Sequence, residues 1–201
     1  CDILIFLNSR IQPIVYGDIN PANIMLRPDG QLVLIDFGIA GGCKLNDMLA
    51  LGTRGYAAPE QYSAGAQIDA RTDIYALGVT LYQLVTGENP AKPSYELKPI
   101  RQIDPTLSSG LEQIIEKCTN INPDQRFQSA QELKNALNAY CTMARSSTGT
   151  RIRNSFNVWE KKWIFAKESE TISYTTENME MIYYNAELLI HLYSNLEDTE
   201  I

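Results

Sequence analysis

The fold is decided by the stretch VYGDINPANIML, residues 15–26, and by LVLIDFG, residues 32–38, which follows it closely. The apolar runs NIML and LVLI flank the tripeptide Pro-Asp-Gly at residues 28–30. Proline and glycine supply the backbone geometry that tight turns require. The pattern therefore predicts a β-hairpin that begins near Asn23 and ends just before Asp36.

An antiparallel hairpin would bring Asn23 and Asp36 close together, and both side chains offer oxygen atoms. Magnesium prefers oxygen ligands and usually takes only one or two of them from protein. Asp18 lies five residues before Asn23 on the same loop and remains available to accept a proton. From spacing alone, the sequence predicts a pair of metal ligands beside a second carboxylate.

The composition is that of a globular protein with one domain and an extension. The 201 residues are 44% hydrophobic and 20% charged, which is ordinary for a chain that buries a core. The net charge of −7 argues against general binding to nucleic acids or anionic membranes, because phosphate groups attract basic surfaces. The four cysteines are widely separated, which argues against a zinc site and favours reduced cytosolic thiols.

No apolar run approaches the roughly 18 to 20 residues of a membrane-spanning helix, and no signal peptide is recognisable. The chain begins with Cys1 and the apolar run ILIFL, which suggests that it continues upstream. We therefore expect a cytoplasmic protein without a membrane segment in this part of the chain.

The strongest helix signal is DIYALGVTLYQLVTG, residues 73–87. Its apolar positions surround most of the cylinder, which predicts a central buried helix that ends at Gly87. Ser129 with Glu132 predicts a capping box at the start of a later helix. Weaker helical spacing occurs at residues 2–9, 109–121 and 129–140.

These stretches resemble the motifs of eukaryotic-type protein kinases. YGDINPANIML is similar to the catalytic loop H-R-D-x-K-P-x-N, and DFG at residues 36–38 matches the magnesium-binding motif. GTRGYAAPE, residues 52–60, resembles the end of the activation segment, and the helix at 73–87 resembles the buried helix that follows it. NPDQRFQSAQEL, residues 122–133, resembles the closing segment that supplies an arginine. The motifs occur in family order across roughly residues 1–142, which makes a chance match negligible.

The resemblance implies an α+β fold that is mainly helical: the large lobe of a bacterial serine/threonine protein kinase, with a small β-hairpin at the catalytic loop, residues 16–26. No glycine-rich phosphate loop and no V-A-I-K-like strand lysine precede this loop, so we expect the small N-terminal lobe to be absent from this chain. We expect the C-terminal lobe at 1–142, a linker at 143–157 and a partly helical tail of unknown function at 158–201.

The resemblance also implies roles for single residues. Asp18 would orient the substrate hydroxyl and accept its proton, and Thr53 would lie beside Asp18 at the hydroxyl-acceptor site. Asn23 and Asp36 would hold Mg²⁺ on ATP, and Met25 would lie under the adenine. The implied reaction is ATP-dependent phosphorylation of serine and threonine hydroxyls in a protein substrate.

Other residues of the motifs have structural roles in the family. Glu60 and Arg126 would form a buried ion pair that ties the activation segment to the helical base. Asp73, at the start of the central helix, would bond the backbone of the catalytic loop near Tyr16. These residues would support the site without touching the substrate.

Three positions in the catalytic loop depart from the family pattern. Tyr16 replaces a histidine at a position that chiefly serves packing. Gly17 replaces the arginine that receives a phosphorylated residue, and residues 39–51 contain no serine, threonine or tyrosine. We therefore hypothesise that activation does not require phosphorylation in that stretch.

The third departure concerns the chemistry itself. Asn20 replaces the lysine that stabilises the transferring phosphate, and an asparagine brings no charge. By analogy with the loss of one transition-state donor, the rate would fall on the order of 10² to 10³. Lys44 and Arg54 are candidates for a substituting cation.

Two other functions compete with an active protein kinase. Asn20 favours a pseudokinase, a scaffold module that uses the kinase fold for binding, whereas the retained base and metal ligands favour an enzyme. A small-molecule kinase of the aminoglycoside-phosphotransferase type disagrees with the Ala-Pro-Glu ending at residues 58–60 and with Arg126, because that peptide-substrate platform belongs to protein kinases. We expect the full-length parent to be a transferase and this chain alone to be inactive.

Overall fold

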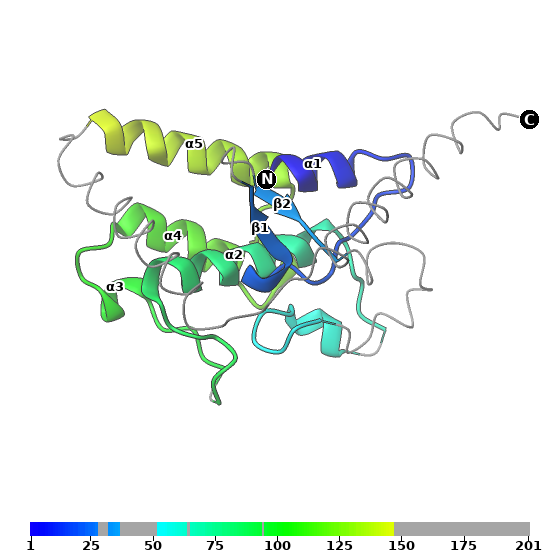
Figure 1. Ribbon diagram of the computed structural model, residues 1–201, viewed down its shortest axis with the longest axis horizontal. Helices are drawn as coiled ribbons and strands as arrows, with labels where there is room; N and C mark the ends of the chain where they lie inside the picture. Colours follow the sequence, from blue (N-terminus) through cyan, green and yellow to red (C-terminus); the bar gives the residue numbers. More distant parts are fainter. Residues whose placement is uncertain (28–31, 37–51, 64, 94, 147–201) are drawn as a thin grey trace, which may run out of the picture. The chain divides into compact units, whose positions relative to one another are not determined.

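Helices make up most of the structure, and a small two-stranded sheet accompanies them, as predicted (Figure 1). The computed structural model describes residues 1–27, 32–36, 52–63, 65–93 and 95–146. The α-helices in these ranges are α1 (Asp2–Asn8), α2 (Ala70–Thr86), α3 (Ile100–Ile103), α4 (Ser109–Cys118) and α5 (Ala130–Ser146). The other elements are strands β1 (Ile24–Leu26) and β2 (Leu32–Leu34) and the 3-10 turns η1 (Pro21–Asn23), η2 (Pro59–Tyr62) and η3 (Pro123–Gln125).

Helix α2 is the central element of the fold. It packs against α1, α3, α4 and α5, and its residues Ile74 and Val79 are completely buried. The side chain of Asp69 caps the helix by accepting the N–H of Arg71 at 2.9 Å, and the helix ends at Gly87, whose φ is 74°. The prediction of a central buried helix that stops at Gly87 is confirmed. The helix begins three residues before the predicted start, because its cap lies outside the apolar pattern.

Helices α2 and α4 approach each other closely at Gly78. A Cβ added to Gly78 would lie 2.4 Å from the Cβ of Cys118, so a larger residue does not fit at this crossing without movement. Cys118 is fully buried, and burial raises the pKa of its thiol to about 12. The thiol therefore behaves as a small apolar group at neutral pH.

The predicted hairpin is present. Strands β1 and β2 pair antiparallel, with Ile24 opposite Leu34 and Met25 opposite Val33. Ile24 and Leu34 pack against a core cluster to which α1, the catalytic loop, α2 and α5 all contribute, so the hairpin is attached to the helical core. The turn at residues 28–31 lies outside the described residues.

Helix α5 starts at the predicted place but runs six residues beyond the predicted end. It therefore includes residues 143–146, the first part of the range 143–157 assigned to a linker, because the segment TMARS contains good helix formers.

Only one of the two hydrogen bonds of the predicted capping box at the start of α5 is formed as predicted. The N–H of Glu132 donates to Ser129 Oγ at 3.1 Å, but the Glu132 carboxylate accepts the N–H of Gln128, at 2.7 Å, instead of that of Ser129. The tail at 158–201 lies outside the described residues.

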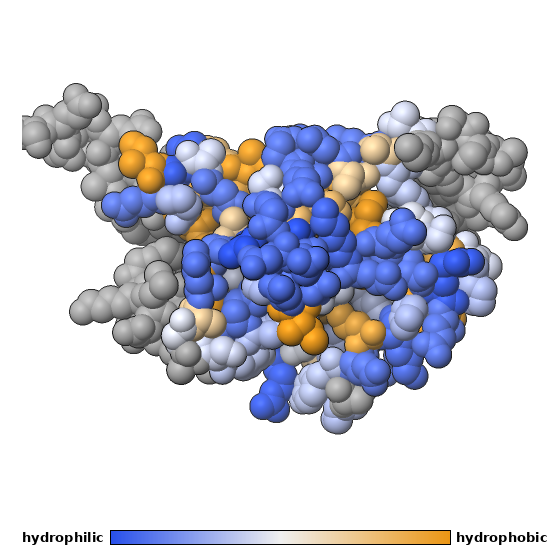
Figure 2. Space-filling model, turned by 180° about the vertical axis from the view of Figure 1, so that it is seen from behind, coloured by the Kyte–Doolittle hydropathy of each residue, from blue (hydrophilic) through white to orange (hydrophobic). Residues whose placement is uncertain are grey.

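Polar side chains cover most of the centre of the face seen in Figure 2, and apolar groups appear there only in separate patches. Among the described helices, none combines the length and apolar character needed to cross a membrane. Cys1, Cys118 and Cys141 are unpaired thiols, and Cys43 lies outside the described residues.

Candidate active site

The carboxylate of Asp18 is held from two sides. Its Oδ1 accepts the backbone N–H of Thr53 at 2.7 Å, and its Oδ2 accepts a hydrogen bond from Asn23 Nδ2 at 3.0 Å. Asn23 Nδ2 also donates to the Asp18 carbonyl at 2.9 Å. The catalytic loop and the 52–63 segment therefore orient the same carboxylate, and three of the sequence-predicted site residues lie together.

Asn20 belongs to the catalytic loop and is only 3% exposed. Its Nδ2 donates to the Asp18 carbonyl at 3.0 Å and to Thr53 Oγ1 at 3.1 Å. Its Oδ1 accepts the N–H of Ala22 at 2.9 Å and thereby caps η1. Both ends of the carboxamide are thus bonded within the site, so Asn20 organises the loop beside Asp18.

Asp73 anchors the catalytic loop to α2. It is fully buried, and its two carboxylate oxygens accept the N–H groups of Tyr16 at 2.9 Å and Gly17 at 2.8 Å. Burial raises the pKa of Asp73 to about 6, while the two N–H bonds act in the opposite direction. The predicted contact of Asp73 with the loop backbone is confirmed.

Tyr16 does more than fill the position of a histidine. Its ring is buried, and its hydroxyl donates to the carbonyl of Ile35, the residue before Asp36. Burial first, and then the charges of Asp18, Asp36 and Asp73, raise the pKa of the phenol well above its usual range. The sequence prediction treated Tyr16 only as packing. The signal that it missed is that a buried tyrosine hydroxyl normally needs a partner.

The hairpin brings the two predicted metal ligands to neighbouring positions. The N–H of Ile35 donates to the Asn23 carbonyl at 2.9 Å, which extends the β1–β2 pairing by one residue pair and leaves Asp36 directly after it. Asp36 is exposed and has a φ of 63°. The side-chain hydrogen bonds of Asn23 to Asp18 both use its nitrogen, so its Oδ1 is the atom that could bind a metal. An amide oxygen beside a carboxylate suits Mg²⁺, which binds oxygen and takes few protein ligands. Met25 lies half-buried in the middle of β1.

A buried ion pair fastens the 52–63 segment to the helical base. The Glu60 carboxylate accepts hydrogen bonds from Arg126 Nη1 at 2.6 Å and Nη2 at 2.8 Å, and from Thr72 Oγ1 at 3.0 Å. Arg126 Nε donates to the Asn120 carbonyl at 2.7 Å. Burial alone would raise the pKa of Glu60, but the bonds with Arg126 outweigh it and hold the pKa below its usual value. The predicted ion pair is confirmed.

A hollow of about 380 Å³ is lined by Arg54, the residue after Thr53, and by other residues of the 52–63 segment. The guanidinium carbon of Arg54 lies 5.7 Å from the ring centroid of Tyr95 at its wall. Of the two cations considered as substitutes for the missing lysine, Arg54 therefore lines this hollow, and Lys44 lies outside the described residues. The lining residues are Arg54, Gly55, Ala57, Tyr62, Tyr75 and Tyr95.

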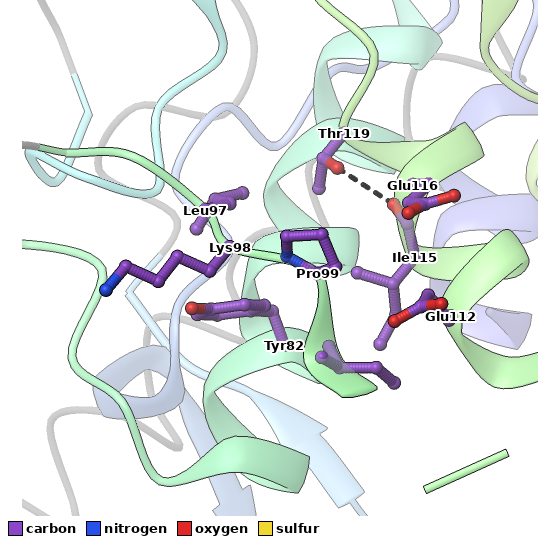
Figure 3. Close-up of a pocket in the computed structure, with 9 residues that line it drawn as sticks. Tyr82, Leu97, Lys98, Pro99, Glu112, Ile115, Glu116 and Thr119 are labelled. Carbon is purple, nitrogen blue, oxygen red and sulfur yellow. Dashed lines mark hydrogen bonds between the residues drawn. The ribbon is translucent and has the colours of Figure 1, made fainter. Parts of the chain in front are cut away.

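A second, smaller hollow lies where α2, α3 and α4 meet (Figure 3). Tyr82 and Ile115 form part of its wall, and the Thr119 hydroxyl donates to the Ile115 carbonyl at 2.9 Å beside it. Its volume of about 70 Å³ has room for roughly two water molecules. It includes no residue of the catalytic loop and is too small for a nucleotide.

Comparisons with known proteins agree with this geometry. The protein kinase domain family matches residues 4–137. The chain is 33% identical over 168 residues to tyrosine-protein kinase MasK of Myxococcus xanthus, which covers 75% of this chain and 26% of that protein. It is 37% identical over 138 residues to a probable serine/threonine-protein kinase of Streptomyces coelicolor, a match that covers 60% of this chain and 20% of that protein. It is 33% identical over 151 residues to serine/threonine-protein kinase PknB of Mycobacterium tuberculosis, a match that covers 67% of this chain and 24% of that protein.

The family match covers well over half of the chain, and it includes the catalytic loop, the hairpin and the ion pair described above. The chain spans about a quarter of the length of these three relatives. The chain therefore belongs to the protein kinase family, and it is related to the bacterial enzymes of the eukaryotic, or Hanks, type.

Proposed function

We propose that the full-length protein containing this chain transfers the terminal phosphate of ATP to serine and threonine hydroxyls of a protein substrate. The observation that carries this proposal is the Asp18 carboxylate, which Thr53 and Asn23 hold at 2.7 and 3.0 Å. A carboxylate held in this way can orient a substrate hydroxyl and take up its proton. The names of two of the three relatives specify serine/threonine kinases and support these acceptor residues.

Asn23 and Asp36 would hold Mg²⁺ together with the phosphates of ATP, and Met25 would contribute to the adenine site. The bound metal neutralises charge on the phosphate oxygens. Asn23 would also position the proposed base, because the hydrogen bonds from its Nδ2 hold Asp18 next to Asn23, itself a proposed metal ligand. A cytoplasmic location is part of this proposal.

The substrate polypeptide would lie along the 52–63 segment. A hollow lined by Arg54 supports this placement, because Arg54 directly follows Thr53, whose N–H holds Asp18. Its tyrosine rings and the Arg54 guanidinium offer both apolar and cationic contacts to residues that flank the acceptor hydroxyl.

A pseudokinase that serves as a scaffold is the second candidate, and Asn20 is the observation that favours it. The lysine of the family pattern would bring a positive charge to the transferring phosphate, whereas the Asn20 carboxamide is neutral and bonded to Asp18 and Thr53. An Asn20→Lys variant of the full-length protein tests this point. Unchanged turnover would show that Asn20 does not limit the rate.

The deciding experiment is transfer of radiolabelled phosphate by the full-length protein, followed by identification of the labelled amino acids. We expect label on serine and threonine, and a fall of about 10² to 10⁴ in rate for Asp18→Asn, because the variant loses the proton acceptor. A wild-type protein that binds ATP but transfers no phosphate would favour the scaffold. Label on tyrosine alone would show that tyrosine, and not serine or threonine, is the acceptor residue.

The 201 residues themselves contain no glycine-rich phosphate loop and no strand lysine of the family type. Those parts cover the nucleotide and position its phosphates. We therefore expect this polypeptide, tested alone by calorimetry, to bind ATP weakly and to turn over too slowly to measure. Tight ATP binding by this polypeptide would contradict the expectation.

A further inference from the structure

A fully buried glutamine, Gln61, connects the catalytic loop to the 52–63 segment. Its Nε2 donates to the Gly17 carbonyl at 2.8 Å, and its Oε1 accepts the N–H of Ala58 at 2.8 Å. Buried amides normally have partners at both ends, and here the two partners belong to different segments. The motifs of the sequence did not single out this residue.

The contact with Gly17 acts directly on the backbone of Asp18. The Gly17 carbonyl belongs to the peptide group that joins Gly17 to Asp18, while the Gly17 N–H is bonded to Asp73. The stretch before the proposed base is thus held by α2 on one side and by η2 on the other. Asp73 ties it to the rigid core, whereas Gln61 ties it to the segment that carries Thr53.

The Gln61 carboxamide packs closely against Gly52, at the start of the 52–63 segment. A Cβ added to Gly52 would lie 3.1 Å from Gln61 Nε2 and 2.9 Å from the Cβ of Ala57, and Gly52 has a φ of 141°. A side chain at position 52 would therefore press on Gln61 and strain the backbone. The next residue, Thr53, supplies the N–H that holds the Asp18 carboxylate.

We propose that Gln61 is a positioning residue for Asp18. By tying the Gly17–Asp18 peptide to Ala58, it sets the carboxylate of Asp18 against the N–H of Thr53, although it touches no reacting atom itself. A glutamine suits this place because its carboxamide combines N–H donors with an acceptor oxygen and adds no charge beside Asp18. The catalytic consequence rests on the proposed function, whereas the structural consequence does not.

The test compares the wild-type full-length protein with Gln61→Met, which keeps the volume and removes the hydrogen bonds to the Gly17 carbonyl and the Ala58 N–H. We expect hydrogen exchange at the Thr53 amide to accelerate at least about tenfold while amides within α2 keep their protection. We also expect kcat to fall by about 10- to 100-fold with the KM for ATP nearly unchanged, because only the orientation of the base is disturbed. Thr80→Val is the matched control, since Thr80 is also fully buried and, among the described residues, its hydroxyl bonds only the Ala76 carbonyl within α2.

Unchanged exchange at Thr53 in Gln61→Met would overturn the proposal, and so would a rise in KM with kcat unchanged. Should Gln61→Met fail to fold, the wild-type protein still provides a test, because the burial and bonding of Gln61 predict slow exchange of its side-chain amide protons. In the wild-type protein, fast exchange of both Gln61 side-chain amide protons would likewise overturn the assignment. If the wild-type protein transfers no phosphate, the proposed function fails, and the exchange at Thr53 alone decides the role of Gln61.

Discussion

Glu60 and Gln61 are neighbours in η2, yet they anchor the same segment by opposite chemistry. Glu60 forms a buried ion pair with Arg126 and thereby joins the segment to the helical base. Gln61 uses a neutral carboxamide to join it to the catalytic loop. Asn20, in the catalytic loop, makes a second neutral connection between the two, because its carboxamide bonds both the Asp18 carbonyl and Thr53 Oγ1.

The difference corresponds to what each residue bonds: Gln61 and Asn20 bond the backbone of the Asp18 loop, whereas Glu60 bonds Arg126. A charge close to a carboxylate shifts its pKa and so changes how well it accepts a proton. Gln61 and Asn20 hold the backbone around Asp18 through neutral amides and so add no charge beside its carboxylate. The ion pair instead joins the segment to the helices. There, Thr72 bonds Glu60, and the backbone carbonyls of residues 71, 120 and 121 accept hydrogen bonds from Arg126.

Breaking the charged anchor has the largest expected effect. Arg126→Met leaves Glu60 buried without its cation and should lower the free energy of unfolding by about 3 to 5 kcal/mol, measured by urea denaturation. The control is the double variant Glu60→Gln with Arg126→Met, which removes both charges and should recover at least about 1 kcal/mol. A double variant no more stable than Arg126→Met would show that packing, and not the unpaired charge, causes the loss.

The anchor at Asp73 comes next. Asp73→Ala leaves the N–H groups of Tyr16 and Gly17 without acceptors and should lower the free energy of unfolding at neutral pH by about 2 to 3 kcal/mol. Because burial raises the pKa of Asp73 to about 6, the folded state binds this proton more tightly than the unfolded state. The stability advantage of wild type over Asp73→Ala should therefore shrink as the pH rises from about 4 to about 6 and stay constant above. An advantage that grows over this range would show that the N–H bonds outweigh burial.

The neutral anchor in the catalytic loop should have a smaller effect. Asn20→Ala removes the cap of η1 and both donor contacts, and should lower the free energy of unfolding by about 1 to 2 kcal/mol. Asn20→Asp is the matched comparison, because it keeps the acceptor for the N–H of Ala22 but cannot donate to Thr53. Because Asn20→Asp also adds a charge beside Asp18, an Asn20→Asp variant more stable than Asn20→Ala would show that the cap contributes, and an Asn20→Ala variant as stable as the wild-type protein would contradict the prediction.

The smallest expected effect concerns the hydroxyl of Tyr16. Tyr16→Phe keeps the buried ring and removes only the donor to the Ile35 carbonyl, so the free energy of unfolding should fall by about 0.5 to 1.5 kcal/mol. A thermal unfolding series measures this change, and Tyr140→Phe, which removes the contact with Ser108 Oγ, is the exposed comparison. A loss of several kcal/mol in Tyr16→Phe would place this bond among the main anchors of the site.

The sequence predicted the elements whose signals are local. Helix α2 was predicted because its apolar residues recur along the chain and Gly87 ends it, and the hairpin because two apolar runs flank a turn. The roles of Asp18, Asn23, Asp36 and Thr53 came from family resemblance, since spacing alone indicated only a pair of metal ligands. The extension of α5 was missed because it has no strong apolar pattern, and the capping partner of Glu132 differs from the predicted one by a single residue.

The sequence by itself determined where helices and strands form and which family they build, because apolar period, turn residues and motif order can all be read along the chain. Only the tertiary structure decided which partner each buried polar side chain finds. Asn20 meets a residue 33 positions away, Gln61 one 44 positions away and Arg126 one 66 positions away. Nothing local specifies such pairs, since each forms only when packing removes both groups from water and leaves them to satisfy each other.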